Sequence, residues 1–329
     1  MIYDQLGRTG LRVSAIGIGA GGPSRLGLAN GHSRDTAIKL IRFGLDRGVN
    51  VIDSAASYGT EDLVGTAIKG SRAKLMLSTK AALGPYFWSW DGSRTASKLS
   101  ARLGEETGFV SSGEAVEKRV DASLRRLNTD YIDIFHLHAV TPKQYTSALE
   151  RALPVLIRLK ESGKVRWVGI TEAFPRDTTH QMLTRAAVEG VFDCMMIGLN
   201  CLNQSGAPIV AQAKRYGIGL IAMHTVRGLR GKKSFQTLLD KLVSFGLIEK
   251  SEGDADKILK LLNEHGVTSL PEAAIRFCRY ELGADIILSG TGDTAHLGAN
   301  IAACDAGPLP DIITAEFRKL FSKLSALTG

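Results

Sequence analysis

The chain lacks the features that mark membrane-bound, secreted and zinc-stapled proteins. No run of about 18 apolar residues occurs, so no membrane-spanning helix is predicted. The opening residues, MIYDQLGRTG, contain no basic segment followed by an apolar one, as a secretory signal would. Cysteine is scarce, and Cys194, Cys201, Cys278 and Cys304 have no partners at short spacing, which argues against a zinc cluster or a disulfide framework. We therefore expect a cytoplasmic protein with reduced, mostly buried thiols and no metal.

Positive charge is in excess but is not concentrated. The formal net charge is +8, yet no run of lysine and arginine is longer than Lys232-Lys233. Such spreading favours solvated helix faces over a nucleic-acid surface, with an anionic ligand as the alternative. With 44% hydrophobic and 22% charged residues, the composition is that of a globular chain able to bury a large core. Neither nucleic acid nor a membrane is expected as a partner, and no oligomeric state is indicated.

What the sequence does contain is a repeated alternation of strand and helix patterns. Strands are predicted at residues 15–20, 49–52, 74–80, 131–138, 165–171, 193–198, 218–223 and 285–289. Helices are predicted at residues 33–48, 60–70, 111–127, 142–163, 178–188, 205–217, 269–282 and 293–303. Two of them begin with capping-box pairs, Ser111 with Glu114 and Ser269 with Glu272. Eight parallel strands close a barrel, so we expect an α/β fold, a (β/α)8 TIM barrel formed by residues 1–329 as a single domain.

Three segments stand outside this repeat. Gly7 and Gly10 predict a small N-terminal hairpin. The connections after the third and seventh strands, residues 84–111 and 226–254, exceed the usual length of about 4–6 residues and are typical of binding loops. The first carries five aromatic residues, which form either a substrate wall or a small core of their own: Tyr86, Phe87, Trp88, Trp90 and Phe109.

A doubly wound open sheet is the alternative architecture. It needs a phosphate-binding glycine loop after its first strand, and Gly17, Gly19 and Gly22 do spell Gly-x-Gly-x-x-Gly. Pro23 follows them and no helix opens there, so the match is weak. We interpret these glycines as tight packing and a turn at a strand end.

Four side chains that handle protons fall near three neighbouring strand ends. Asp53 and Tyr58 follow the second strand, Lys80 ends the third and His138 ends the fourth. The carboxyl ends of barrel strands converge on one mouth, so we expect these groups to meet. Lys80 should lower the pKa of Tyr58 from its ordinary value of about 10, and Asp53 should hold Lys80 charged. With His138 donating a hydrogen bond to a substrate oxygen, the set suits reduction of a carbonyl by hydride from a cofactor.

At these residues the sequence resembles the aldo-keto reductase superfamily over nearly the whole chain. The resemblance is carried by Asp53-Ser-Ala-Ala-Ser-Tyr58-Gly59, Leu77-Ser-Thr-Lys80, Ser123-Leu-Arg-Arg-Leu127, Asp130-Tyr-Ile-Asp-Ile-Phe-His-Leu-His138 and Gly163-Lys-Val-Arg-Trp-Val-Gly-Ile170. It implies a nicotinamide-dependent barrel without a Rossmann domain, with Asp53, Tyr58, Lys80 and His138 as its catalytic tetrad. The implied substrate is a small-molecule carbonyl (aldehyde, ketone or sugar) or the corresponding alcohol. A sugar or polyol dehydrogenase working in the oxidative direction is equally compatible.

The resemblance also implies a cofactor-binding set that departs from the family's usual residues. Thr171-Glu172 stands where Ser-Asn is usual, and Met223-His224 stands where Ser-Pro is usual. Met196 replaces a usual Gln, and Leu199 replaces an aromatic residue that commonly stacks on the nicotinamide ring. The implied set is Asp53, Thr171, Glu172, Met196, Met223, His224, Arg227, Ser289, Gly290, Thr291, His296 and Asn300.

The choice between the two nicotinamide cofactors depends on a few charges. Gly290 and His296 occupy positions where NADP-preferring members often place Lys and Arg, and Asp293 would repel a 2′-phosphate. Arg227 or Lys232 on the long loop could restore the attraction. Because NADP is the commoner cofactor in the family, NADP(H) is expected over NAD(H).

Two other classes of function are weighed against this one. His136 and His138 lie two residues apart on one strand and could ligate a metal in a hydrolase, but no cluster at the other strand ends completes a site. We interpret His136 as a hydrogen-bonded residue of the barrel interior. The second alternative is a redox-silent subunit that only binds a nucleotide, as some members of the superfamily do.

Overall fold

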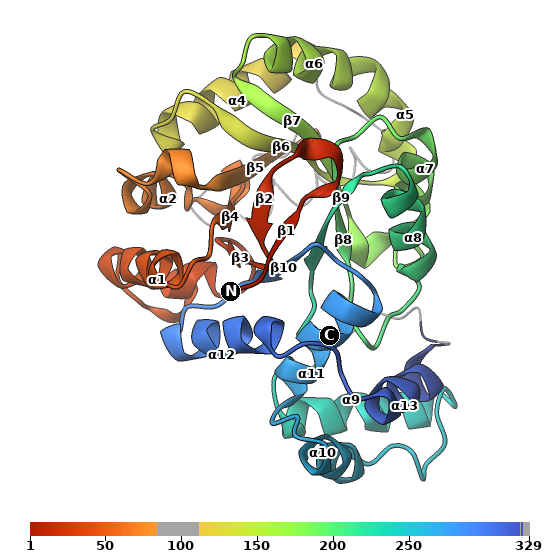
Figure 1. Cartoon of the computed structure of the whole chain (residues 1–329). Coiled ribbons are helices and arrows are strands. Elements are labelled where there is room, and N and C mark those ends of the chain that lie inside the picture. Colours follow the sequence, from red (N-terminus) through yellow and green to blue (C-terminus); the bar gives the residue numbers. More distant parts are fainter. Residues whose placement is uncertain (84–111, 323, 325–329) are drawn as a thin grey trace.

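A computed structural model describes residues 1–83, 112–322 and 324 of the chain (Figure 1). Eight parallel strands close into a barrel in the order β10-β3-β4-β5-β6-β7-β8-β9. They are β3 (Ile16–Gly19), β4 (Val51–Asp53), β5 (Met76–Ala82), β6 (Ile132–Val140), β7 (Val165–Glu172), β8 (Cys194–Gly198), β9 (Gly219–Met223) and β10 (Ile286–Ser289). The closed barrel predicted from the sequence is therefore confirmed.

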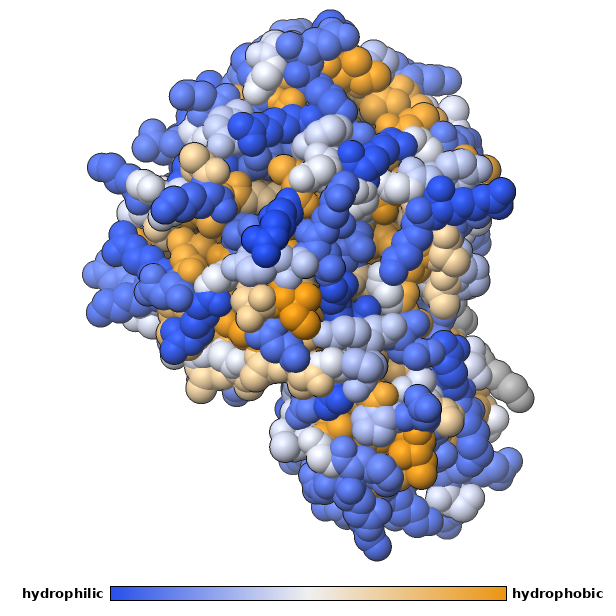
Figure 2. Space-filling view, in the orientation of Figure 1, coloured by the Kyte–Doolittle hydropathy of each residue, from blue (hydrophilic) through white to orange (hydrophobic). Residues whose placement is uncertain are grey.

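Helices surround this barrel (Figure 1). Within the described residues they are α1 (Arg34–Asp46), α2 (Glu61–Ala67), α4 (Gly113–Leu127), α5 (Pro142–Arg151), α6 (Leu153–Glu161), α7 (Gln181–Glu189), α8 (Ala207–Arg215), α9 (Lys232–Ser244), α10 (Ala255–Glu264), α11 (Leu270–Arg276), α12 (Thr294–Asp305) and α13 (Asp311–Phe321). None of them is both long enough and apolar enough to cross a bilayer. Hydrophilic side chains are spread over the face drawn in Figure 2, with apolar residues showing between them.

The single helix predicted over residues 142–163 is wrong, because the chain forms two helices there. α5 ends at Arg151 and α6 begins at Leu153, with Ala152 between them. Pro154 occupies the first turn of α6. A proline has no amide hydrogen to donate to the preceding turn, so a continuous helix is interrupted at this point.

The expected N-terminal hairpin is present and closes one end of the barrel. β1 (Tyr3–Gln5) pairs antiparallel with β2 (Arg12–Ser14), and the hairpin lies in front of the barrel strands in Figure 1. It contributes Leu6 and Val13 to an apolar cluster with residues from the barrel strands. The cluster's buried members are Leu6, Val13, Val51, Met76, Ile134, Cys194, Met196, Ile221 and Ile286. The carboxyl ends of the strands therefore form the open mouth.

Several predicted boundaries shift by a few residues. The strand predicted at residues 74–80 is β5, which ends at Ala82, and the one predicted at residues 131–138 is β6, which ends at Val140. Lys80 and His138 therefore each lie two residues before a strand end. At α4 the capping residue is Ser112, whose Oγ accepts a hydrogen bond from the amide of Ala115. The predicted cap, Ser111, lies outside the described residues. Two adjacent serines offer the same capping chemistry, so the sequence alone does not separate them.

The connection predicted at residues 226–254 is not a plain loop. It contains α9, whose buried residues Phe235, Leu239 and Leu242 recur at helical spacing. Phe235 packs against Phe321 of α13, with ring centroids 6.5 Å apart. The helices α9, α10 and α13 gather at one side of the barrel (Figure 1). The other long connection, residues 84–111, with its aromatic residues, lies outside the described part of the chain.

Candidate active site

Asp53 and Lys80 form a buried ion pair on neighbouring strands. The Nζ atom of Lys80 lies 2.7 Å and 2.5 Å from the two carboxylate oxygens of Asp53 and donates to the carbonyl of Ser54 at 2.9 Å. Ser78 adds a hydrogen bond to Asp53 at 2.7 Å. Burial alone would lower the pKa of Lys80, but the Asp53 carboxylate and Tyr58 together outweigh it, and the pKa is raised above the ordinary value. Lys80 is therefore held as an ammonium group inside the barrel.

Tyr58 lies beside this ion pair on a short turn that follows β4. The turn spans Ala56–Tyr58 and ends at Gly59, which has a positive φ of 66°. The Tyr58 ring meets the His138 ring edge-on at a centroid distance of 5.8 Å, and Nζ of Lys80 lies 5.2 Å from its centroid. The structure thus brings together Asp53, Tyr58, Lys80 and His138.

Two opposing effects determine the pKa of Tyr58. Burial raises it above the ordinary value, and the ammonium of Lys80 offsets only part of that rise. The expected effect of Lys80 on this pKa is present, but the removal of water from around the phenol is the larger effect, and the net shift is upward. In consequence, Tyr58 is in its protonated form near neutral pH.

His138 is a neutral imidazole in this setting. Burial, assisted by the positive charge of Lys80, lowers its pKa to about 3. A neutral imidazole carries one N–H donor and one acceptor nitrogen. His138 therefore has a single N–H with which to donate a hydrogen bond to an oxygen at the mouth of the barrel.

His136 lies deeper in the barrel, beside Lys80 in the register of β5 and β6. It is fully buried, and its ring faces Gly169, where an added Cβ would lie 2.1 Å from Nδ1. Neither ring nitrogen has a hydrogen-bond partner among the described residues, so the predicted hydrogen bond is not found. The physical reason is the glycine opposite, which offers no side chain. No three potential metal-binding side chains come together anywhere in the described ranges.

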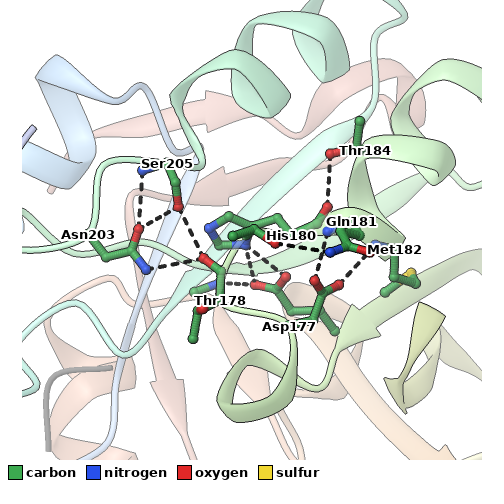
Figure 3. A network of polar contacts seen from close by, with 11 residues as sticks. Asp177, Thr178, His180, Gln181, Met182, Thr184, Asn203 and Ser205 are labelled. Carbon is green, nitrogen blue, oxygen red and sulfur yellow. Dashed lines mark hydrogen bonds and ion pairs between the residues drawn. The ribbon is translucent and has the colours of Figure 1, made fainter. Parts of the chain in front are cut away.

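The end of β7 is occupied by side chains that already have protein partners. Thr171 Oγ1 accepts a hydrogen bond from the amide of Ala139 at 2.8 Å. The carboxylate of Glu172 accepts from the amide of Gly198 at 2.7 Å and lies 2.8 Å from Nδ1 of His180. Figure 3 shows the polar contacts around His180, whose neighbour Asp177 caps α7. Sequence reasoning missed His180, because the pair depends on how the loop after β7 returns to the strand.

A stack of three rings separates the ends of β7 and β9. Phe174 lies 5.5 Å from the ring of His180 and 5.7 Å from the ring of His224, measured between centroids. Phe174 also packs onto Gly198, where an added Cβ would lie 2.6 Å from its ring. Burial lowers the pKa of His224 to about 4. His224 is therefore a neutral member of this stack.

A cavity of about 640 Å³ lies between the loop after β9, the start of α11 and the helix α12. Five predicted cofactor residues line it: Ser289, Gly290, Thr291, His296 and Asn300. Asn300 donates a hydrogen bond to Ser289 at 2.8 Å, which fixes both side chains in the wall. Thr225, Arg230, Thr268 and Glu272 also line the cavity and were missed from the sequence. This mixture of small, polar and charged groups fits the nucleotide half of a dinucleotide cofactor.

The remaining predicted cofactor residues do not reach this cavity. Met196 belongs to the apolar cluster of the barrel interior, and Leu199 is fully buried. Lys232, a predicted cation for the cofactor, pairs with Asp256 at 2.6 Å. Arg230, two residues earlier, is the cation of this loop that lines the cavity.

Asp293 caps the helix that forms one wall of the cavity. Its Oδ1 accepts hydrogen bonds from the amides of Ala295 at 2.6 Å and His296 at 3.2 Å. These bonds lower the pKa of Asp293. Two of the first amides of α12 are therefore satisfied by the chain's own carboxylate, which places a negative charge at the N-terminus of that helix.

Comparisons with known proteins place these observations in context. A sequence model of the Aldo/keto reductase family matches residues 15–320. L-galactose dehydrogenase of Arabidopsis thaliana is 30% identical over 227 residues, a match covering 66% of this chain and 63% of that protein. The NADH-specific methylglyoxal reductase of Escherichia coli K12 is 31% identical over 173 residues, half of each chain. The holo structure of aldo-keto reductase AKR11C1 from Bacillus halodurans covers 99% of this chain and 98% of its own, with a TM-score of 0.71 and 22% identity.

Proposed function

The chain belongs to the aldo/keto reductase family of oxidoreductases, and we propose that it interconverts a carbonyl group and an alcohol using a nicotinamide cofactor. One observation carries the proposal. The phenol ring of Tyr58 has the neutral imidazole of His138 at 5.8 Å between centroids and the ammonium of Lys80 at 5.2 Å from its own centroid. Such a set can deliver a proton to an oxygen that is gaining negative charge.

Each of these groups has a distinct role in the proposed reaction. A bound nicotinamide cofactor supplies or accepts the hydride. Tyr58 donates its proton to the carbonyl oxygen during reduction and takes it back during oxidation. Lys80 stabilises the phenolate left behind, and Asp53 keeps Lys80 charged and in place. The N–H of His138 hydrogen-bonds the reacting oxygen, which orients it towards the phenol.

We assign the adenosine half of the cofactor to the cavity beside α12. Ser289, Thr291 and Asn300 offer hydroxyl and amide groups there, and Arg230 offers a positive charge. Towards the nicotinamide end we retain Thr171 and His224 with Asp53, Met223 and Arg227 as candidate contacts. Glu172 supports that end from within through its contacts with His180 and Gly198, whereas Met196 is buried in the apolar cluster shared with the hairpin.

NADP(H) remains the proposed cofactor, on the ground that NADP is the commoner one in the family, and Arg230 is the group best able to pair with a 2′-phosphate. Asp293 acts against that preference. Titration of protein fluorescence with NADPH and with NADH measures the balance directly. A lower Kd for NADPH supports NADP(H), whereas a lower Kd for NADH rejects this preference without affecting the proposed reaction.

The reaction itself is tested by steady-state assays with both cofactors and in both directions. The substrates are para-nitrobenzaldehyde as a general probe, and methylglyoxal and L-galactose because the names of two relatives specify them. Turnover in the wild type, lost in Tyr58→Phe although that variant still binds the cofactor, is the expected result. Cofactor binding without turnover across a wider panel of aldehydes, ketones, sugars and polyols would instead favour a redox-silent nucleotide-binding subunit.

A further inference from the structure

The backbone of Gly21 lies directly against the ring of Tyr58. A Cβ added at Gly21 would lie 2.3 Å from Cε2, 2.5 Å from Cδ2 and 2.5 Å from Cζ of that ring. Real Cβ atoms essentially never approach another heavy atom within 3.0 Å. The phenol therefore occupies space that any other residue at position 21 would claim with its own side chain.

The neighbouring glycines show that this contact is particular to Gly21. Gly22 has open space where a Cβ would lie and needs glycine for its positive φ of 69°. Gly19, two residues earlier, would make only ordinary contacts, the nearest at 3.6 Å to the carbonyl of Ser289. Gly17 packs on Val51 inside the barrel, where an added Cβ would lie 2.6 Å from Cγ1 of Val51. Packing at Gly17 and a turn at Gly22 agree with the sequence-based interpretation, which does not include Gly21.

Two hydrogen bonds hold the backbone next to Gly21 to the turn that carries Tyr58. The amide of Ala20 donates to the carbonyl of Asp53 at 2.8 Å, and the hydroxyl of Thr60 donates to the carbonyl of Ala20 at 3.1 Å. Asp53 and Thr60 flank the turn on its two sides. The segment and the turn are therefore fixed relative to each other, whereas the Tyr58 ring can still rotate about its side-chain bonds.

The ring thus lies in a slot with three different walls. Gly21 covers the ring carbons, His138 meets the ring edge-on, and the ammonium of Lys80 lies 5.2 Å from the centroid. If the Gly21 wall moved inwards by the width of a methyl group, the ring would shift while the backbone stayed in place. A misplacement of about 1 Å in reacting groups can cost about 100-fold in rate.

We propose that Gly21 is a positioning residue for the reaction: its bare backbone sets where the Tyr58 hydroxyl lies relative to Lys80 and His138. This inference rests on the proposed function, because it concerns the group that we assign as the proton donor. It predicts that even the smallest side chain at position 21 slows proton transfer without weakening cofactor binding or the fold.

The test compares Gly21→Ala with Gly298→Ala, using para-nitrobenzaldehyde as the probe substrate. Gly298 lies in α12, does not line the cavity, and would meet only Phe43, at 3.7 Å. In Gly21→Ala we expect kcat to fall by about 10- to 100-fold, while KM, the cofactor Kd and Tm stay close to wild type. In Gly298→Ala all four quantities should stay near wild type.

Three outcomes would overturn the inference. They are an unchanged kcat in Gly21→Ala, a loss confined to KM or cofactor affinity, and loss of the cooperative unfolding transition, since the last would make Gly21 a requirement of the fold. Failure of the proposed function gives a different result, namely wild-type protein that turns over no carbonyl or alcohol with either cofactor. A wild type that is active and a Gly21→Ala variant that is equally active would overturn the positioning role alone.

Discussion

Lys80 reaches across from one barrel strand to place its Nζ 2.5 Å from Oδ2 of Asp53 on the next strand. Both side chains are almost fully buried, at 1% and 3% exposed for the two residues. A buried charge without a partner is strongly unfavourable, so each residue depends on the other. The ion pair consequently links the stability of the barrel to the chemistry at its mouth.

Asp53→Asn should destabilise the fold and abolish activity together. The substitution leaves the ammonium of Lys80 buried without its counter-charge, which costs about 3–5 kcal/mol of unfolding free energy. Chemical denaturation measures that loss. Asp62→Asn is the matched control, because Asp62 pairs with Arg34 on the surface and contributes little. Equal stabilities of the two variants would contradict the interdependence of Asp53 and Lys80.

The same pair predicts how stability depends on alkaline pH. The pKa of Lys80 is higher in the folded protein than its ordinary value. The stabilisation is therefore complete below the unfolded pKa of about 10.4 and is lost as pH rises through the folded value. Unfolding free energy measured between pH 8 and pH 11 should fall only at the upper end, and Asp53→Asn should lack that part of the fall.

The charge state of His138 predicts the shape of the pH–rate profile. Its pKa of about 3 means that the imidazole is already neutral throughout the range from pH 5 to pH 8. We expect no inflection of kcat from His138 in that range. An acid limb near pH 6 that disappears in His138→Asn would show that the imidazole is charged in the working enzyme.

Glu172→Gln tests the buried pair at the end of β7. The amide can still accept from Gly198, but the hydrogen bond between His180 and a carboxylate is lost, and we expect a loss of about 1–3 kcal/mol of unfolding free energy. The exposed Glu150→Gln should leave stability nearly unchanged. If Glu172→Gln is as stable as wild type and instead changes cofactor affinity, Glu172 contacts the cofactor rather than supporting the strand end.

Asp293→Asn isolates the charge at the start of α12, because asparagine also caps helices well. Removing the carboxylate should improve the Kd for NADPH by about three- to tenfold while leaving that for NADH nearly unchanged. Asp254→Asn is the control, since Asp254 caps α10 in the same way, away from the cavity. Parallel changes for both cofactors would remove Asp293 from cofactor selection.

The barrel and its central residues could be predicted because their signals are local. The carboxyl ends of barrel strands converge, so assigning Asp53 and Lys80 to the ends of neighbouring strands predicts that they meet, as they do. The period-two alternation of a strand gives His136 the same face as His138, but it cannot show that the residue opposite His136 is a glycine.

The features that escaped prediction depend on contacts distant in sequence or on burial. The pair of Glu172 and His180 depends on a returning loop. The direction of the Tyr58 pKa depends on how completely water is removed from the phenol. The sequence predicts Lys232 as a cation for the cofactor, but this residue begins α9 and its side chain pairs with Asp256. Arg230, two residues earlier, lines the cavity instead. The helix α9 itself is readable from the spacing of Phe235, Leu239 and Leu242.

The hairpin of β1 and β2 has a consequence for how substrate enters the barrel and product leaves it. With Leu6 and Val13 packed into an apolar cluster with the barrel strands, the hairpin covers its end of the barrel, and we expect reactant and product to pass through the opening at the carboxyl ends of the strands. A product that still occupies the opening therefore blocks binding of the next reactant, so we expect product inhibition to compete with the substrate.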